Sequence, residues 1–239
     1  MAPKIRKLAK EILNDPKEIN LSISKPAAGV TQKVYLAFDE QKTALVRNII
    51  NQHPDFKTII IFCSTKKKVD QLARNLKGKG HNVAGISSDY EQAEREKVIL
   101  DFKSRRTRIV VATDVLSRGI DIKDIDLVIN HDVPGDAEDY VHRVGRTARA
   151  ASKGLAITLV SDKDMFKFSR IEELIETTLE KLAPPQELGA GPEWRVSKGG
   201  SGGNRRTKKP FNRKGKKPYS KGPRKNDSSS NSGNSNGSN

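Results

Sequence analysis

The sequence predicts an α/β fold: a single domain with an open, mostly parallel β-sheet flanked by helices, followed by a disordered basic C-terminal tail. Short β-rich runs alternate with amphipathic helical stretches between Gln32 and about Lys181. Strands that alternate with helices pair in parallel through right-handed crossovers. Some of the runs, such as Thr58–Cys63, are apolar almost throughout, which is typical of strands buried on both faces. The tail contains no such run.

Each element is predicted by a local signal in the sequence. The predicted strands span residues 34–38, 58–63, 82–87, 108–112, 127–131 and 155–160, and the predicted helices span 40–52, 66–79, 88–103, 137–144 and 163–182. The pattern from Ser88 to Glu91 predicts a capping box that opens the third helix, where Val98, Leu100 and Phe102 should be partly buried. Asp136 is expected to cap the fourth helix, and Pro184-Pro185 should end the last one.

These elements divide the chain into three parts: a lead-in segment at 1–31, the folded domain at 32–182 and the tail at 183–239. From Arg195 onward there are 13 Lys or Arg and one acidic residue, a net of +12, out of +16 for the whole chain. The tail has very few apolar residues, and burying so little apolar surface cannot offset the entropy of ordering its backbone. Clustered cations with sparse aromatic residues suit phosphate neutralisation and base stacking. A solubilising tail or linker fits the same composition.

The chain has one cysteine, Cys63, and therefore no internal disulfide framework. A single cysteine fits a reducing compartment, and its apolar surroundings predict a buried, inert thiol. No apolar stretch approaches the roughly 18 residues of a membrane span, and the first residues lack the apolar core of a signal peptide. We expect a soluble cytoplasmic protein without a metal site of its own.

The segment from Tyr140 to Arg149 has the most chemical content, because it holds three arginines and a histidine: His142, Arg143, Arg146 and Arg149. Arg146 and Arg149 are three positions apart, so on a helical turn both guanidinium groups would project to one side. Two planar cations facing one way suit the oxygens of a polyphosphate. A solvated basic helix end is the plainer interpretation of such a cluster.

A second segment, from Ala112 to Asp121, directly follows a predicted strand, where ligands bind in open α/β sheets. The plainer interpretation of Thr113 and Asp114 is that they cap a short helix. Arg118, Gly119 and Asp121 place a cation, a flexible backbone point and an acceptor together. Asp121 could accept a hydrogen bond from a ribose hydroxyl or only from nearby backbone.

Together the two segments resemble motifs V and VI of the DEAD-box family of superfamily 2 helicases. Ile60–Thr65 resembles motif IV, and Gln92-Ala93-Glu94-Arg95 matches the family's Q-x-x-R element. The similarity runs from about Ile5 to about Leu182, which covers the C-terminal RecA-like domain, and 1–31 then corresponds to the interdomain linker. The tail resembles the bacterial RhlE-like subgroup. Ala148 stands where the family commonly has Gly, a change that should cost little.

The resemblance implies a role for each matched residue. Arg146 and Arg149 would be the catalytic arginine fingers that reach the γ-phosphate, and Gly119 and Asp121 would contact the nucleotide. His142 and Arg143 would couple the ATP site to the upstream RecA-like domain. The residues that would line the RNA backbone are Ser64, Gln92, Arg95, Thr113 and Arg118. Binding would then be independent of base sequence, since backbone contacts carry no base information.

The sequence contains neither a G-x-x-x-x-G-K-[ST] phosphate loop nor an Asp-Glu-Ala-Asp run. In the family these motifs lie in the first domain, where ATP and Mg²⁺ are held. We therefore expect a fragment that hydrolyses ATP negligibly by itself and acts within an ATP-dependent RNA helicase. Two rival functions remain open: a nucleotide-independent RNA-binding or annealing module, and half of a DNA-directed helicase.

Overall fold

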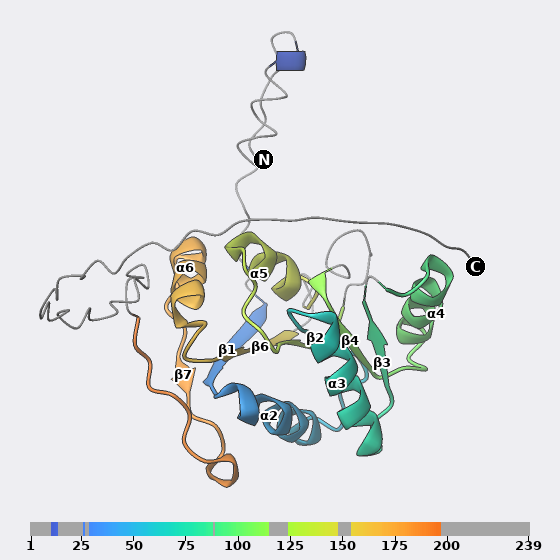
Figure 1. Ribbon diagram of the computed structural model, residues 1–239, viewed down its shortest axis with the longest axis horizontal. Helices are drawn as coiled ribbons and strands as arrows, with labels where there is room; N and C mark the ends of the chain where they lie inside the picture. The colour runs from blue at the N-terminus through green and yellow to red at the C-terminus, as the bar shows by residue number, and fades with distance from the viewer. Residues whose placement is uncertain are drawn as a thin grey trace, which may run out of the picture. The chain divides into compact units, whose positions relative to one another are not determined.

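A computed structural model of the chain describes residues 11–13, 26, 29–87, 89–114, 124–147 and 154–196. Within these ranges, seven strands form one sheet in the order β3-β4-β2-β5-β6-β1-β7 (Figure 1). All of the pairings are parallel, as the sequence predicted. The strands are β1 Val30–Leu36, β2 Ile59–Phe62, β3 Val83–Ile86, β4 Ile109–Ala112, β5 Leu127–Asn130, β6 Gly154–Val160 and β7 Lys181–Leu182.

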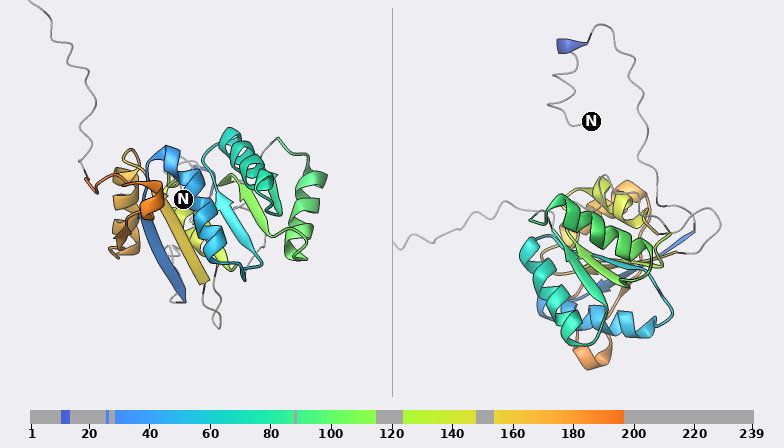
Figure 2. Two further views of the ribbon diagram at one scale, coloured as in Figure 1. Left: turned by 90° about the horizontal axis from the view of Figure 1, so that it is seen from below. Right: turned by 90° about the vertical axis from the view of Figure 1, so that its right-hand side faces the viewer.

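Helices cover both faces of the sheet (Figures 1 and 2). They are α2 Asp39–Gln52, α3 Lys66–Gly78, α4 Gln92–Lys103, α5 Ala137–Val144 and α6 Met165–Ile175. α2 and α3 pack on one face, and α4, α5 and α6 pack on the other. Of the helices in the described ranges, none is both long enough and apolar enough to cross a bilayer.

The central strands are apolar throughout because both of their faces are covered. Along β2, Ile59 and Ile61 point toward α2 and α3, whereas Ile60 and Phe62 point toward α4. Successive side chains of a strand alternate between the two faces, so a strand buried on both faces needs apolar residues at every position. The continuous apolar run at 58–63 therefore correctly predicted a central strand.

The prediction for the start of α4 was wrong. The helix begins at Gln92, and its capping box is formed by Glu91 and Glu94. The Glu91 amide donates to the Glu94 carboxylate at 3.2 Å, so the box lies three residues later than the predicted one. Of the side chains expected in the core, Phe102 is buried, but Leu100 is 60% exposed because it lies on the outer side of the helix.

The last helix is also shorter than predicted. α6 ends at Ile175, and Glu176 turns the chain with a left-handed φ of 52°. Glu172 fixes the segment that follows this turn. Its carboxylate accepts from the Leu179 backbone amide at 2.7 Å and pairs with the Lys181 ammonium. The chain continues as β7, which pairs with β1 and which the sequence analysis missed.

The folded part extends beyond the predicted boundary at Leu182, through residues 183–196, which we call the strap. The side-chain amide of Gln41 on α2 donates to the backbone carbonyls of Leu188 and Ala190 at 2.7 and 3.1 Å. Trp194 packs edge-on against Phe168 of α6. A Cβ at Gly191 would lie 2.0 Å from the Leu36 carbonyl oxygen, so only glycine permits this approach. Composition concealed the strap because one tryptophan and one closely packed glycine, Gly191, contribute to its packing.

Candidate functional site

Polar residues follow four neighbouring strands at one edge of the sheet, where each strand ends. Ser64 comes shortly after β2, Asp114 after β4, Asp132 after β5 and Ser161 after β6. The carboxyl ends of parallel strands share one edge, and ligands of open α/β sheets bind there. The structure therefore places these four polar residues at the edge of the sheet where a ligand is expected to bind.

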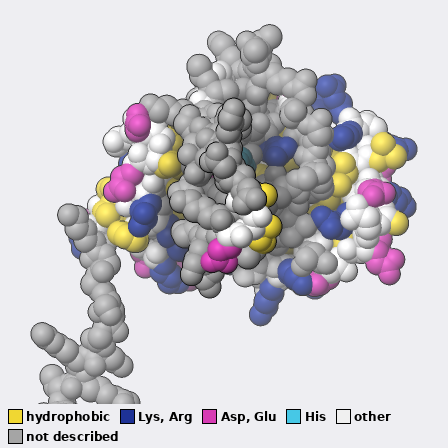
Figure 3. Space-filling view, turned by 90° about the horizontal axis from the view of Figure 1, so that it is seen from above, with side chains coloured by type: hydrophobic (Ala, Val, Ile, Leu, Met, Phe, Trp, Pro, Cys, Tyr) yellow, Lys and Arg dark blue, Asp and Glu magenta, His cyan; other side chains and the backbone are white. Residues whose placement is uncertain are grey.

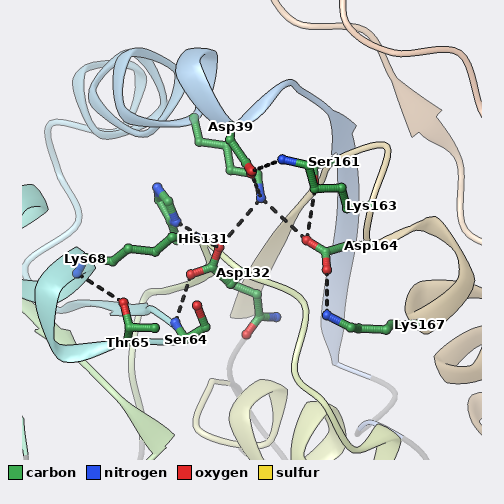
Figure 4. A network of polar contacts seen from close by, with 12 residues as sticks. Asp39, Ser64, Thr65, Lys68, His131, Asp132, Ser161, Lys163, Asp164 and Lys167 are labelled. Carbon is green, nitrogen blue, oxygen red and sulfur yellow. Dashed lines mark hydrogen bonds and ion pairs between the residues drawn. The ribbon is translucent and has the colours of Figure 1, made fainter. Parts of the chain in front are cut away.

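Asp132 is the centre of a polar network at this edge (Figure 4). One carboxylate oxygen, Oδ2, accepts from the Ser64 backbone amide at 2.8 Å. The other, Oδ1, accepts from the Lys68 ammonium of α3 at 2.6 Å and lies 3.5 Å from Nδ1 of His131. Burial alone would raise the pKa of Asp132, but His131, Lys68 and the Ser64 amide outweigh it and hold that pKa far below its ordinary value. The carboxylate is therefore ionised.

A fully buried lysine supports this network from α2. The Lys42 ammonium lies 3.0 Å from Asp39, 3.7 Å from Asp132 and 3.8 Å from Asp164. Burial raises the pKa of Asp39, yet the hydrogen bond and charge of Lys42 bring it below its ordinary value. Buried charges persist only when they are paired, so Lys42 joins the ends of β1, β5 and β6 into one unit.

Arg143 lies inside the domain rather than on its surface. Its side chain is 1% exposed, and its Nε and Nη2 bond both carboxylate oxygens of Asp114 at 2.7 and 2.9 Å. Nη1 donates to the Asp132 carbonyl at 2.9 Å and to the Asn130 side chain at 3.3 Å. The guanidinium also lies over the Phe62 ring, 5.1 Å from its centroid. One side chain thereby ties α5 to the ends of β2, β4 and β5.

α5 is anchored at a second point by Tyr140. This ring is buried edge-on against Phe168, and its hydroxyl donates to Gln32 at 2.8 Å. Burial raises the pKa of Tyr140. Asp136 caps the helix as predicted, accepting from the Glu138 amide at 3.1 Å. His142 lies on the exposed side.

Arg146 lies just beyond α5, whose end agrees with the predicted boundary. α5 ends at Val144, and Arg146 lies in the turn after it, half-buried. Thr147 then pairs with Ile125 in a parallel bridge, and its hydroxyl donates to the Ile125 carbonyl. Arg149 lies outside the described residues, so the spatial relation of the two arginines stays a prediction.

Four of the predicted RNA-contacting residues follow three adjacent strands. Ser64 follows β2, Thr113 follows β4, and Gln92 and Arg95 stand on the first turn of α4 beyond β3. The Gln92 side chain accepts from Arg95 at 3.4 Å. Exposed basic side chains continue along the same helix and its end at Lys97, Lys103, Arg105 and Arg106. Figure 3 shows Lys and Arg side chains on this side of the molecule. Arg118, Gly119 and Asp121 lie outside the described residues.

Cys63, His131 and Asp132 bring three potential metal-ligand atoms within 4.8 Å of one another. This group does not suit a divalent cation, because Oδ1 of Asp132 already contacts Lys68 and lies 3.7 Å from Lys42. Burial, followed by the charge of Asp132, raises the pKa of the Cys63 thiol to about 12. The thiol is therefore protonated and inert, as expected for a buried cysteine.

Sequence reasoning missed Asp132, Lys68 and Lys42. A usable signal for the first was present, because Asn130-His131-Asp132 places three polar residues at the end of a fully apolar strand. The lysines gave no signal, since Lys42 and Lys68 look like ordinary solvated positions at the start of amphipathic helices. The burial of Lys42 and the pairing of Lys68 with Asp132 depend on tertiary packing.

The fold and this edge define a parallel α/β domain of the nucleotide-binding type. A family model described as the helicase conserved C-terminal domain matches residues 41–151. An Arabidopsis thaliana DEAD-box ATP-dependent RNA helicase 46 is 39% identical over 214 residues, covering 84% of this chain and 33% of that protein. The E. coli DEAD-box protein SrmB, solved bound to the regulator RraA, is 34% identical with a TM-score of 0.61, covering 70% of this chain and 95% of that one.

S. cerevisiae Dbp5 bound to RNA and ADP BeF3 is 30% identical with a TM-score of 0.67, covering 76% of this chain and 49% of that chain. The chain belongs to the DEAD-box RNA helicases and comprises their C-terminal, RecA-like helicase domain. It spans between a quarter and two fifths of the length of the curated relatives it matches.

Proposed function

We propose that this chain is the second half of an ATP-dependent RNA helicase, which closes over ATP and a single RNA strand to separate short duplexes. The observation that carries the proposal is the anchoring of α5. Arg143 and Tyr140 fix this helix from inside the domain, so its outer side and the following turn, with His142 and Arg146, are held at the carboxyl edge. A preorganised cation at a cleft rim is what phosphoryl transfer requires.

The proposed roles divide between two ligands. Arg146 and Arg149 act as arginine fingers on the γ-phosphate, and Gly119 and Asp121 contact the sugar end of the nucleotide. The RNA backbone is contacted by Ser64, Gln92, Arg95, Thr113 and Arg118. His142 faces the upstream domain directly, whereas Arg143 acts from within, by holding Asp114 and α5 in place.

ATP with Mg²⁺ is the proposed substrate, and the metal ligands are proposed to lie in an upstream RecA-like domain. The described residues fit this division, because the acidic groups at the edge are already paired with lysines or arginine: Asp39, Asp114, Asp132 and Asp164. The chain's contribution is cationic, and cations stabilise the charge that develops on the transferred phosphoryl group.

The basic tail is proposed to add sequence-independent contacts to RNA phosphates. The net charge of +12 from Arg195 onward supports this, since each neutralised phosphate releases counterions and makes binding salt-dependent. Membership of the bacterial RhlE-like subgroup and a cytoplasmic location are further proposals, based on the tail's composition and on the single cysteine.

The test joins this chain to a first helicase domain that carries the phosphate loop and the Asp-Glu-Ala-Asp motif. ATP turnover is then measured with and without single-stranded RNA, for the fusion and for the chain alone. The proposal expects RNA-stimulated turnover only in the fusion. Robust turnover by the chain alone would contradict it. RNA binding by the fusion that ignores ATP analogues would instead favour the annealing module.

A further inference from the structure

Basic side chains also gather at the opposite edge of the sheet, where the strands begin. Hydrogen bonds join the segments that lead into neighbouring strands there: the Asn82 side chain donates to the Arg106 carbonyl at 2.5 Å, and the Ile59 amide donates to the Arg108 carbonyl at 2.9 Å. Helices α3 and α4, which flank β3 (Figure 1), end at the same edge. The exposed basic residues of these segments, which we call the amino-edge cations, are Lys57, Lys77, Lys79, Lys103, Arg105 and Arg106.

Few acidic groups neutralise these cations. Asp126 is already engaged, because its Oδ2 accepts two backbone amide bonds at 2.7 and 2.9 Å. Asp101 pairs with Nε of Arg106 at 3.0 Å, and Asp55 and Asp124 add two exposed carboxylates. Within the ranges that the structure describes, the other amino-edge cations form no ion pair with a carboxylate. The edge therefore carries an excess of positive charge.

Two histidines report the positive potential of this edge. Burial lowers the pKa of His53, and the charge of Lys33 lowers it further. Burial likewise lowers the pKa of His81, and the charges of Arg108 and Arg47 add to that effect. A nearby cation disfavours the protonated imidazole, whereas a nearby anion favours it. Both rings therefore lie where a bound anion would be stabilised.

Arg105 provides a second observation that does not depend on the sum of charges. It follows α4 with a left-handed φ of 61°, and its amide donates to the Phe102 carbonyl at 3.0 Å. Glycine is the usual residue at such a helix end, because a side chain brings strain in this conformation. The Arg105 side chain is exposed and forms no hydrogen bond or ion pair among the described residues. Strain kept for a side chain that the fold does not use is evidence of a role outside the fold.

The make-up of the amino edge favours a nucleic acid over a protein as the partner. Protein interfaces centre on apolar side chains, but none of the large apolar side chains exposed in the described ranges belongs to the segments 53–58, 79–82 or 103–108. Nucleic-acid interfaces are polar and strongly positive. α4 also links this edge to the proposed RNA contacts Gln92 and Arg95, since its 12 residues span about 18 Å. RNA that passes Gln92 can therefore reach the amino edge.

We propose that the amino-edge cations form a second surface for RNA phosphates, separate from the one at the carboxyl edge. This goes beyond the proposed function, which places RNA at the carboxyl edge and on the tail, and rests on it for the choice of RNA. Contacts to phosphates carry no base information, so binding here is independent of base sequence. A single-stranded extension and a duplex arm present the same phosphates, and the experiment uses both.

The test measures the affinity of the full chain for a single-stranded RNA and for an RNA hairpin at several salt concentrations. Lys79→Gln and Arg105→Gly each remove one cation, and each should reduce the slope of log affinity against log salt by about 0.7 for the single strand or about 0.9 for the duplex. The RNA whose slope falls is the source of the phosphates. Slopes equal to those of the wild type for both RNAs overturn the proposal.

Arg170→Gln is the matched control. Arg170 is exposed on α6, which packs at the far end of the sheet, so its removal changes the net charge equally without touching the amino edge. Its slopes should equal those of the wild type, and an equal fall would reduce the effect to general charge and overturn the proposal. Arg105→Gly should melt no lower than the wild type, because glycine relieves the left-handed strain. If Arg105→Gly melts lower, Lys79→Gln decides the test alone.

Proton NMR titration of the histidine rings locates the RNA independently of the basic tail. Phosphates bound at the amino edge should raise the pKa of His81 in the wild type, and by less in Lys79→Gln. Absence of any rise at His81 and His53 overturns the proposal. An equal rise with polyglutamate in place of RNA would assign the surface to acidic proteins and overturn it too. Failure of RNA to stimulate ATP turnover in the two-domain fusion would instead refute the proposed function.

Discussion

Replacing Arg143 by methionine should destabilise the domain strongly, although the side chain carries a full charge and lies in an arginine-rich segment. Methionine replaces the unbranched apolar stem of the arginine and removes all four of the described hydrogen bonds to Asp114, Asn130 and Asp132. Removing one partner of a buried ion pair costs about 3–5 kcal/mol. Because the Asp114 side chain is 39% exposed and can be rehydrated, we expect the lower end, about 3 kcal/mol.

Chemical denaturation monitored by circular dichroism measures this loss, and thermal melting should show a decrease of about 6–12 °C. The control is His142→Ala on the same helix, whose exposed position predicts a change within about 0.5 kcal/mol. If Arg143→Met were no more destabilising than His142→Ala, the guanidinium would not be the internal anchor of α5.

Three other predictions address separate parts of the domain. Cys63 should resist iodoacetamide at pH 8 in the folded chain and react only on unfolding, because burial raises the pKa of its thiol to about 12; rapid alkylation of native protein would contradict this. The folded-state pKa of Asp132 is held below its unfolded value of about 3.9, so its stabilisation is present above that pH and is lost as the pH falls below it. Below about pH 4 the unfolding free energy of the wild type should therefore fall by about 1.4 kcal/mol per pH unit more steeply than that of Asp132→Asn, and parallel curves would refute the assignment. A chain ending at Leu182 should melt at a lower temperature than one ending at Val196, and Trp194→Ala should reproduce much of that loss, about 2 kcal/mol or more; identical melting of the two truncations would show that the strap adds no stability.

The sheet could be predicted from the sequence because its signals are local. Apolar runs such as 58–63 identify central strands, and alternation with helices implies parallel pairing. The element ends could not be predicted equally well. At Glu172, for example, the carboxylate accepts from the backbone amide of Leu179, seven residues later, after the chain has turned at Glu176. Such contacts depend on the finished fold, so no local pattern announces them.

The candidate site was predicted in part. Motif resemblance directed attention to the segments that follow β2 and β4 and to α5, and the structure places these segments at one edge of the sheet. It did not separate the arginines by environment. Arg143 is buried and fixed by Asp114, whereas Arg146 is half-buried in the turn beyond the helix. Both residues are arginines of the same segment, so the sequence does not tell them apart. Only packing distinguishes an internal anchor from a residue that faces a ligand.

The central claim is that this chain completes an ATP site from outside with its arginines. The most direct measurement is RNA-stimulated ATP turnover of the two-domain fusion carrying Arg146→Ala or Arg149→Ala, with folding checked by circular dichroism. We predict a loss of about 10³–10⁵ in turnover for a finger residue, with stability close to that of the wild type. Turnover unchanged in both variants would contradict the claim.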